Sequence, residues 1–267
     1  MSNKNPPKKM IPDKVITTVL PVITIFALFA FWEIGVLAGV INPSLFSRPT
    51  AIFQAFIFKL TNPIPDGSVL GSHILSSLGV SLSGLLIAIL IGIPLGLVMG
   101  WYKICDALIR PIFEIVRPIP PVAWIPLTII WIGVGLGAKA VIIFFSAFVP
   151  CVINAYTGIR QTNKVLINVA KTYGASNFWI FIHIGIPSAV PMMFAGLKIA
   201  LSNSWGTLVA AEMLASSSGL GYMISMARYL GRLDIVILGM IVIGLFGYLF
   251  TLLFDKIQSK VMKGRVI

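Results

Sequence analysis

Charged and reactive side chains are scarce in this chain of 267 residues. Only 10% of the residues are charged, 8 residues are acidic, and there are 2 histidines and 2 cysteines. Cys105 and Cys151 share no motif with each other or with a histidine, so we expect free thiols and neither a disulfide nor a metal site. His73 and His183 have no partner pattern and are interpreted as ordinary interfacial residues. No nucleophile–base pair or carboxylate dyad is recognisable, so the sequence indicates no catalytic residue and no enzyme activity.

A nucleotide-binding motif is also missing. The phosphate loop Gly-x-x-x-x-Gly-Lys-Ser/Thr does not occur in the chain. Residues 133–139, Gly-Val-Gly-Leu-Gly-Ala-Lys, resemble it faintly but have the wrong spacing. We therefore expect that this chain binds no cofactor itself and hydrolyses no ATP by that route.

Apolar sequence, by contrast, is abundant. Apolar residues make up 58% of the chain and the mean hydropathy is +0.99, which excludes an ordinary soluble domain of this length. Charge-free apolar runs of about 20 residues predict an all-α membrane protein with six transmembrane helices. These runs cover residues 15–40, 72–100, 113–134, 138–158, 189–214 and 235–254. Glycines at four-residue spacing in the second run indicate either a close helix contact or merely the frequency of glycine in such helices.

The positive charges indicate how the helices are oriented. The net charge of +12 does not predict nucleic-acid binding, because the cations lie in tails and loops between the spans. With the N-terminus inside, the cytoplasmic segments contain Lys4, Lys8, Lys9, Lys14, Lys103, Arg110, Arg160, Lys164, Lys171, Lys256, Lys260, Lys263 and Arg265. The outer segments contain only Arg48, Lys59, Lys139, Arg228 and Arg232. This excess predicts that both termini and the loop 159–188 are cytoplasmic.

The chain divides into three parts. Residues 1–71 comprise a cytoplasmic tail, the first transmembrane helix and an outer interfacial segment, in which Ile52, Phe53 and Phe56 indicate a helix lying at the membrane surface. Residues 72–254 form a core of five helices that includes the loop 159–188. Residues 255–267 form a cytoplasmic tail.

The loop 159–188 has the pattern of a short amphipathic helix. Asn163 can cap its start, and the apolar residues Leu166, Val169, Ala170 and Tyr173 recur at three- and four-residue spacing. Gly174, followed by Ala175, can end the helix. A short amphipathic helix on the surface of a membrane protein has an apolar face that needs a partner.

The third span contains four prolines between residues 118 and 126, in the stretch Arg-Pro-Ile-Pro-Pro-Val-Ala-Trp-Ile-Pro-Leu. Each proline removes an amide donor and disrupts the helix, and the freed carbonyls must bind protein or water. Pro120 and Pro121 are therefore interpreted as bordering a pathway, and the alternative is a kink buried between helices.

One face of the fifth span carries polar side chains. Counted from Lys198, the residues Ser202, Trp205 and Glu212 fall within about 40° of one line along a helix. Ionisable groups in a span are rare, and this face is interpreted as lining a water-filled pathway. In the alternative interpretation Lys198 extends to the inner surface and Glu212 lies at the outer rim.

Several stretches resemble the permease subunits of ABC importers. The loop that contains Ala170, Gly174 and Ile184-Gly185-Ile186-Pro187 is similar to the cytoplasmic coupling loop of that family, although Asn168 stands where Glu is usual. The proline-rich stretch 117–127 is similar to the branch that imports taurine, other sulfonates, nitrate and bicarbonate, and most of all to taurine permeases. The stretches 130–135, 204–213 and 218–222 resemble the same branch.

The resemblance implies a type I ABC importer permease fold in a multi-pass protein of the cytoplasmic (inner) membrane. It implies two copies of this chain paired as a homodimer, a cytoplasmic ATPase dimer that binds ATP and Mg²⁺, and an outer solute-binding protein. It also implies that Leu166, Val169, Ala170, Tyr173, Gly174, Ala175 and Pro187 couple the ATPase to the spans. The cargo would be a small anion, taurine or another sulfonate, moved by alternating access, with nitrate or bicarbonate as the alternative cargo.

The sequence leaves two rival classes of protein open. A secondary transporter or channel would work without an ATPase, and a membrane scaffold would carry no solute. Neither rival gives a reason for a capped amphipathic helix that ends at Gly174.

Overall fold

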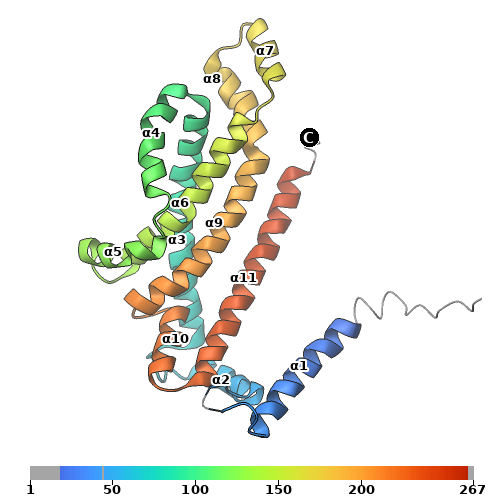
Figure 1. Ribbon diagram of the computed structural model, residues 1–267, viewed down its shortest axis with the longest axis vertical. Coiled ribbons are helices and arrows are strands. Elements are labelled where there is room, and N and C mark those ends of the chain that lie inside the picture. The colour runs from blue at the N-terminus through green and yellow to red at the C-terminus, as the bar shows by residue number, and fades with distance from the viewer. Residues whose placement is uncertain (1–18, 44, 264–267) are drawn as a thin grey trace, which may run out of the picture.

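The computed structural model describes residues 19–43 and 45–263, and within these ranges all regular secondary structure is helical (Figure 1). In the same ranges, 5 helices are long and apolar enough to cross a membrane, or up to 6 if one bent pair counts as a span. The five are α1 (Leu20–Leu37), α3 (Leu70–Trp101), α6 (Leu136–Arg160), the segment Asn177–Leu214 and α11 (Leu233–Met262). The segment Asn177–Leu214 contains α8 (Asn177–Ile180), the π-helical turn η3 (Phe181–Gly185) and most of α9 (Ile186–Ala215). The all-α prediction is confirmed, and the start of the first predicted span at residue 15 lies outside the described residues.

The predicted third span is a broken one. Helix α4 (Lys103–Val116) begins ten residues before the predicted start at residue 113, and it is followed by the 3-10 turn η2 (Pro121–Trp124) and α5 (Ile125–Ile132). The two halves meet at an angle of 84°. Pro118, Pro120 and Pro121 lie at this bend and supply no amide hydrogen to continue the helix, so the disruption expected from the prolines is confirmed.

The three helices α3, α6 and α9 form the centre of the bundle (Figure 1). Glycines let α3 approach α6 closely: a Cβ atom added at Gly96 would lie 2.4 Å from the carbonyl oxygen of Val152, and one at Gly100 would lie 2.4 Å from a methyl group of Ile159. The close helix contact suggested by the glycine spacing is therefore present. Such contacts tighten packing between helices where no hydrophobic effect assists them.

Helix α1 lies apart from this bundle and beside α2 (Pro49–Thr61) (Figure 1). Its side chains are mostly exposed, with Phe26 at 72% and Phe31 at 74%. Glu33 connects the two helices, because its carboxylate accepts hydrogen bonds from the backbone N–H and the hydroxyl of Thr50 at 3.2 and 2.9 Å. An apolar helix this exposed requires lipid or another chain as its surroundings.

The two ends of the molecule carry different short helices. Helix α7 (Lys164–Thr172) lies at the same end as the carboxyl end of α11, whereas α2 and α10 (Leu220–Tyr229) lie at the opposite end (Figure 1). Helix α11 continues as far as Met262.

Candidate functional site

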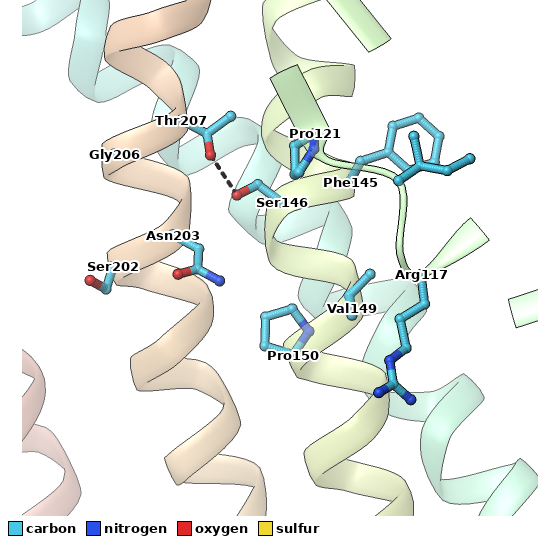
Figure 2. A pocket seen from close by; sticks show the side chains of 11 residues that line it. Arg117, Pro121, Phe145, Ser146, Val149, Pro150, Ser202, Asn203, Gly206 and Thr207 are labelled. Carbon is cyan, nitrogen blue, oxygen red and sulfur yellow. Dashed lines mark hydrogen bonds between the residues drawn. The ribbon is translucent and has the colours of Figure 1, made fainter. Parts of the chain in front are cut away.

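A cavity of about 460 Å³ opens between α6, α9 and the bend that separates α4 from η2. Figure 2 shows side chains that line it, among them Arg117, Pro121, Ser146, Asn203 and Thr207. The cavity exists because the broken segment leaves α6 incompletely covered at this level. Trp124 holds the segment in place by stacking on Phe145, with ring centroids 4.5 Å apart and an interplanar angle of 11°.

Polar groups from two spanning helices face this cavity. The hydroxyls of Ser146 on α6 and Thr207 on α9 share a hydrogen bond of 2.8 Å, drawn in Figure 2. Ser202, Asn203 and Gly206 also line it and are exposed in the isolated chain. Polar side chains within a spanning helix are costly to leave against lipid, so this face needs water or protein beside it.

Arg117 gives the cavity its charge. Of the residues that the structure describes, it is the only cation in the lining. Its guanidinium lies 3.3 Å from Glu114, and both side chains are about half exposed, at 47% and 53%. An ion pair this accessible to solvent stabilises weakly, about 0–1 kcal/mol, so Arg117 is free to exchange Glu114 for another anion.

The predicted pathway residues divide between different surroundings. Pro121 and Ser202 line the cavity together, whereas Pro120 is exposed at the start of η2. Lys198 and Trp205 line a second cavity of about 220 Å³ against α11, which Ser202 also reaches. The face of α9 that carries Asn203 and Thr207 lies about 160° around the helix from the predicted line.

Two contacts hold the face of α9 that carries Lys198 and Trp205 against α11. The Lys198 ammonium lies 2.6 Å from the carboxylate of Asp255, with both side chains nearly half exposed. Trp205 is buried, and its indole N–H donates a 2.9 Å hydrogen bond to the carbonyl oxygen of Ile243. Contact with a solute stays a prediction for Lys198, Ser202, Trp205 and Glu212.

Glu212 is fully buried and belongs to a polar cluster at the α10 end of the bundle. Ser77 on α3 donates to both of its carboxylate oxygens at 2.8 and 2.9 Å, and the backbone N–H of Gly221 donates at 2.9 Å. Ser77 also accepts a 2.9 Å hydrogen bond from the backbone N–H of Leu220. Glu212 and Ser77 therefore hold the start of α10 to α3 and α9.

Gly219, just before α10, touches the same carboxylate. Its φ is +114°, and an added Cβ would lie 2.1 Å from Oε1 of Glu212. Only glycine fits both the left-handed backbone and the space. Its backbone N–H donates a 3.1 Å hydrogen bond to Nδ1 of His73, which is fully buried although the sequence suggested an interfacial position.

Asp66 and Lys59 extend this cluster toward α2. Lys59 is fully buried, and its ammonium lies 2.6 Å from Asp66 and donates to the carbonyl of Ser68 at 2.6 Å. Nε2 of His73 lies 3.3 Å from the other carboxylate oxygen of Asp66. Burial, the largest single influence, raises the pKa of Asp66, but hydrogen bonds and charge from His73 and Lys59 outweigh it and hold this pKa below its ordinary value.

Helix α7 has the boundaries that its sequence predicts. The Asn163 side chain accepts a 2.8 Å hydrogen bond from the N–H of Val165 and caps the start. At the other end Gly174 has φ +81°, and the N–H of Ala175 donates to the carbonyl of Ala170 at 3.0 Å. This is the hydrogen bonding of a glycine-based C-terminal cap.

The apolar face of α7 is uncovered. Leu166 is 51% exposed, Val169 49% and Tyr173 87%. Pro187 lies in the first turn of α9, within the helical segment that follows the loop. The exposed face therefore lies on a short helix joined to a spanning one, and its role in coupling stays a prediction.

Spanning helices around a polar cavity, with an amphipathic helix exposed at one end, define a transport subunit of a membrane. Comparison with known proteins identifies its family. Residues 88–263 match the family described as the binding-protein-dependent transport system inner membrane component. The chain belongs to that family and is a multi-pass inner-membrane permease of an ABC importer.

Relatives that are named for different solutes have similar sequence identity to this chain. A putative ABC transporter permease protein of Methanocaldococcus jannaschii is 40% identical over 207 residues, 77% of each chain. The taurine transport system permease protein TauC of Escherichia coli is 32% identical over 240 residues, 89% of this chain and 86% of the relative. The nitrate import permease protein NrtB of Leptolyngbya laminosa is 32% identical over 244 residues, 90% and 86% of the two chains.

A solved structure shows the fold. The structure of the methionine ABC transporter MetNI in inward-facing conformations matches with a TM-score of 0.64 at 20% identity, and the match covers 72% of this chain and 95% of that chain. The type I ABC importer permease fold expected from the resemblance is confirmed.

Several residues of the larger cavity were not predicted from the sequence. Asn203 and Thr207 are four residues apart and therefore share a helix face, which was a readable signal. The prediction followed the charged Lys198, which lies on the nearly opposite face of the helix. Ser146 gave no signal, because its neighbours in the sequence are apolar.

Proposed function

We propose that this permease imports a small anion, taurine or another sulfonate, by alternating access. The observation that carries the proposal is the cavity beside the α4–η2 bend, where Arg117 is combined with the hydroxyls and amide of Ser202, Asn203 and Thr207. A sulfonate needs its charge offset and its oxygens bound by donors, and guanidinium, hydroxyl and amide groups supply both. Taurine also carries an ammonium group, for which the hydroxyl and amide oxygens are acceptors.

Nitrate is the second candidate, with bicarbonate beside it. A relative named for nitrate import is 32% identical to this chain, the same identity as the relative named for taurine transport. A nitrate ion needs only donors, so it would use Arg117 without requiring the acceptor atoms of Asn203.

The path proposed for the solute uses both cavities. Ser202 lines the two of them, so a solute leaving Arg117 would pass Ser202 toward Lys198. There it would compete with Asp255, whose exposed pair with Lys198 is weak enough to open. Glu212 holds the start of α10 and is proposed to shape the outer gate rather than to contact the anion.

Three partners complete the proposed machine. A second copy of this chain would cover the polar residues of α9 that the isolated chain leaves exposed. A cytoplasmic ATPase dimer, which would bind ATP and Mg²⁺, would receive the apolar face of α7, with both termini of the permease on that side. An outer solute-binding protein would deliver the solute at the α10 end. Nucleotide can drive such a cycle only by binding the two conformations with different affinity.

Uptake by vesicles that contain the complete importer tests the proposal. Radiolabelled taurine, a longer sulfonate and nitrate would be compared, each with saturating binding protein. We expect sulfonate uptake, and a loss of on the order of tenfold or more in Arg117→Gln. The variant Lys260→Gln is the control, because it removes a positive charge from an exposed position on α11 that lines neither of the two cavities. Uptake of nitrate alone, or full sulfonate uptake by Arg117→Gln, would contradict the assignment.

A further inference from the structure

A third cavity lies at the α7 end of the bundle and is lined by positive charge. It measures about 350 Å³ and lies between the junction of α3 and α4, the end of α6, and α7. Four cations line it: Lys103, Arg160, Lys164 and Lys171. Among the residues that the structure describes, Asp106 is the only acidic one in the lining.

Asp106 does not neutralise this charge. Its carboxylate is 3.2 Å from Arg110, which lies outside the lining, and 3.6 Å from Arg160. Lys103, Lys164 and Lys171 form no ion pair within residues 19–43 and 45–263. Like charges gathered around one cavity repel each other, and the repulsion falls when an anion binds between them.

The orientation of α7 keeps the cavity apart from any partner protein that covers the apolar face of this helix. At 100° per residue, Lys164, Ile167 and Lys171 centre on one side of the helix. Leu166, Val169 and Tyr173 centre on the side about 180° away. The basic side lines the cavity and faces back to the ends of α3 and α6, so a protein that covers the apolar side does not reach it.

Apolar residues form the floor of the cavity and indicate where it lies relative to the membrane. Met99 and Trp101 end the apolar helix α3, and Ile159 is near the end of α6. Met99 and Ile159 are buried, and Thr162 and Asn177 add neutral polar groups to the lining. A ligand here meets apolar side chains at the ends of two spans and cations on the side toward α7. A phospholipid headgroup lies at this level of a membrane.

We propose that this cavity binds the phosphate group of an anionic phospholipid. The bound phosphate offsets the charge of Lys103, Lys164 and Lys171 and thereby joins α7 to the ends of α3 and α6. Free inorganic phosphate has the same chemistry and would use the same cations, but the apolar floor favours a ligand that is anchored in the membrane. The inference concerns a site separate from the two solute cavities, so its failure would leave the proposed transport function intact.

The test measures lipid binding by the full-length chain in detergent. Native mass spectrometry would compare retention of dioleoylphosphatidylglycerol with that of dioleoylphosphatidylcholine. In the triple variant K103Q/K164Q/K171Q we expect affinity for the anionic lipid to fall on the order of a hundredfold, about fivefold for each lysine. The control K256Q/K260Q/K263Q removes three lysines from the end of α11, at the same end of the molecule and outside this cavity, and should retain the lipid as the wild type does.

The remaining outcomes are distinct. Stabilisation of the wild type, but not of the triple variant, by inorganic phosphate alone would support the site and assign the anion to the solvent. Equal lipid retention by the triple variant, or an equal loss in the control, would overturn the proposal. Loss of ATPase co-purification in the triple variant with unchanged lipid binding would also overturn it, because the cations would then serve a protein. Thermal unfolding of both variants verifies that they are folded.

Discussion

Substitution of Gly219 tests whether the buried carboxylate of Glu212 holds the outer end of the bundle. In Gly219→Ala the new Cβ would lie 2.1 Å from Oε1 of Glu212, and the backbone would keep a φ of +114°. With φ +114° and ψ 168° the backbone lies in a region that residues other than glycine rarely occupy, at a cost of about 1–3 kcal/mol, and displacing the carboxylate from one donor costs about 1.5–3 kcal/mol more. We expect a total destabilisation of about 3–6 kcal/mol.

Gly133→Ala is the matched control. Gly133 has φ +84° and ψ 175°, and nothing lies within 4 Å of an added Cβ, so it shares the backbone cost and not the collision. Thermal unfolding in detergent would be followed by thiol labelling of Cys151, which is 2% exposed, in a Cys105→Ser background. The midpoint of Gly219→Ala should lie below that of Gly133→Ala by on the order of 5–10 °C.

A second comparison separates the collision from general strain. In a Glu212→Ala background, where the carboxylate is absent, adding Gly219→Ala should cost only as much as Gly133→Ala does. Equal midpoints for the two glycine variants in the wild-type background would refute the reasoning, because the Glu212 carboxylate would then move aside without a loss of stability.

Three further predictions concern coupling, the solute path and orientation. Tyr173→Asp should abolish ATPase assembly, since it places a charge on an apolar face whose anchor is worth about 2 kcal/mol or more; co-purification measures this, and wild-type assembly would refute the docking role. Lys198→Ala should lower uptake while leaving basal ATP hydrolysis largely intact, and Lys198→Arg should keep much of the uptake; unchanged uptake in Lys198→Ala would mean that its pair with Asp255 is only structural. Cysteines placed at Ile64 and Lys171 should be labelled from the outside and the inside respectively, and the reverse pattern would contradict the predicted topology.

The spans and α7 could be predicted because their signals are local. Long charge-free runs determine which segments cross a membrane, and the cap at Asn163 and the left-handed Gly174 are properties of neighbouring residues. The break in the third span was also predictable, since proline acts on its own helix.

The sites depend on contacts that no local pattern contains. Ser77 and Glu212 are 135 residues apart, and His73 and Gly219 are 146 apart, so the cluster around Glu212 exists only after folding. The same holds for the larger cavity, where the position of the α4–η2 bend decides which face of α9 is left uncovered. The residues predicted to share a helix face with Lys198 do share it, but helix periodicity alone does not show that α11 lies against that face.

The continuous helix Asn177–Leu214 has a mechanical consequence. Its 38 residues span about 57 Å, from the turn after α7 to the buried carboxylate of Glu212. If it tilts as a stiff lever about its middle by about 5°, each end moves about 2.5 Å. That displacement is nearly the whole length of the 2.8 and 2.9 Å hydrogen bonds from Ser77, which must then break together or carry the start of α10 along. A small rotation at the α7 end would thus act at the other end as a latch with two positions, closed or released, and no stable position between them.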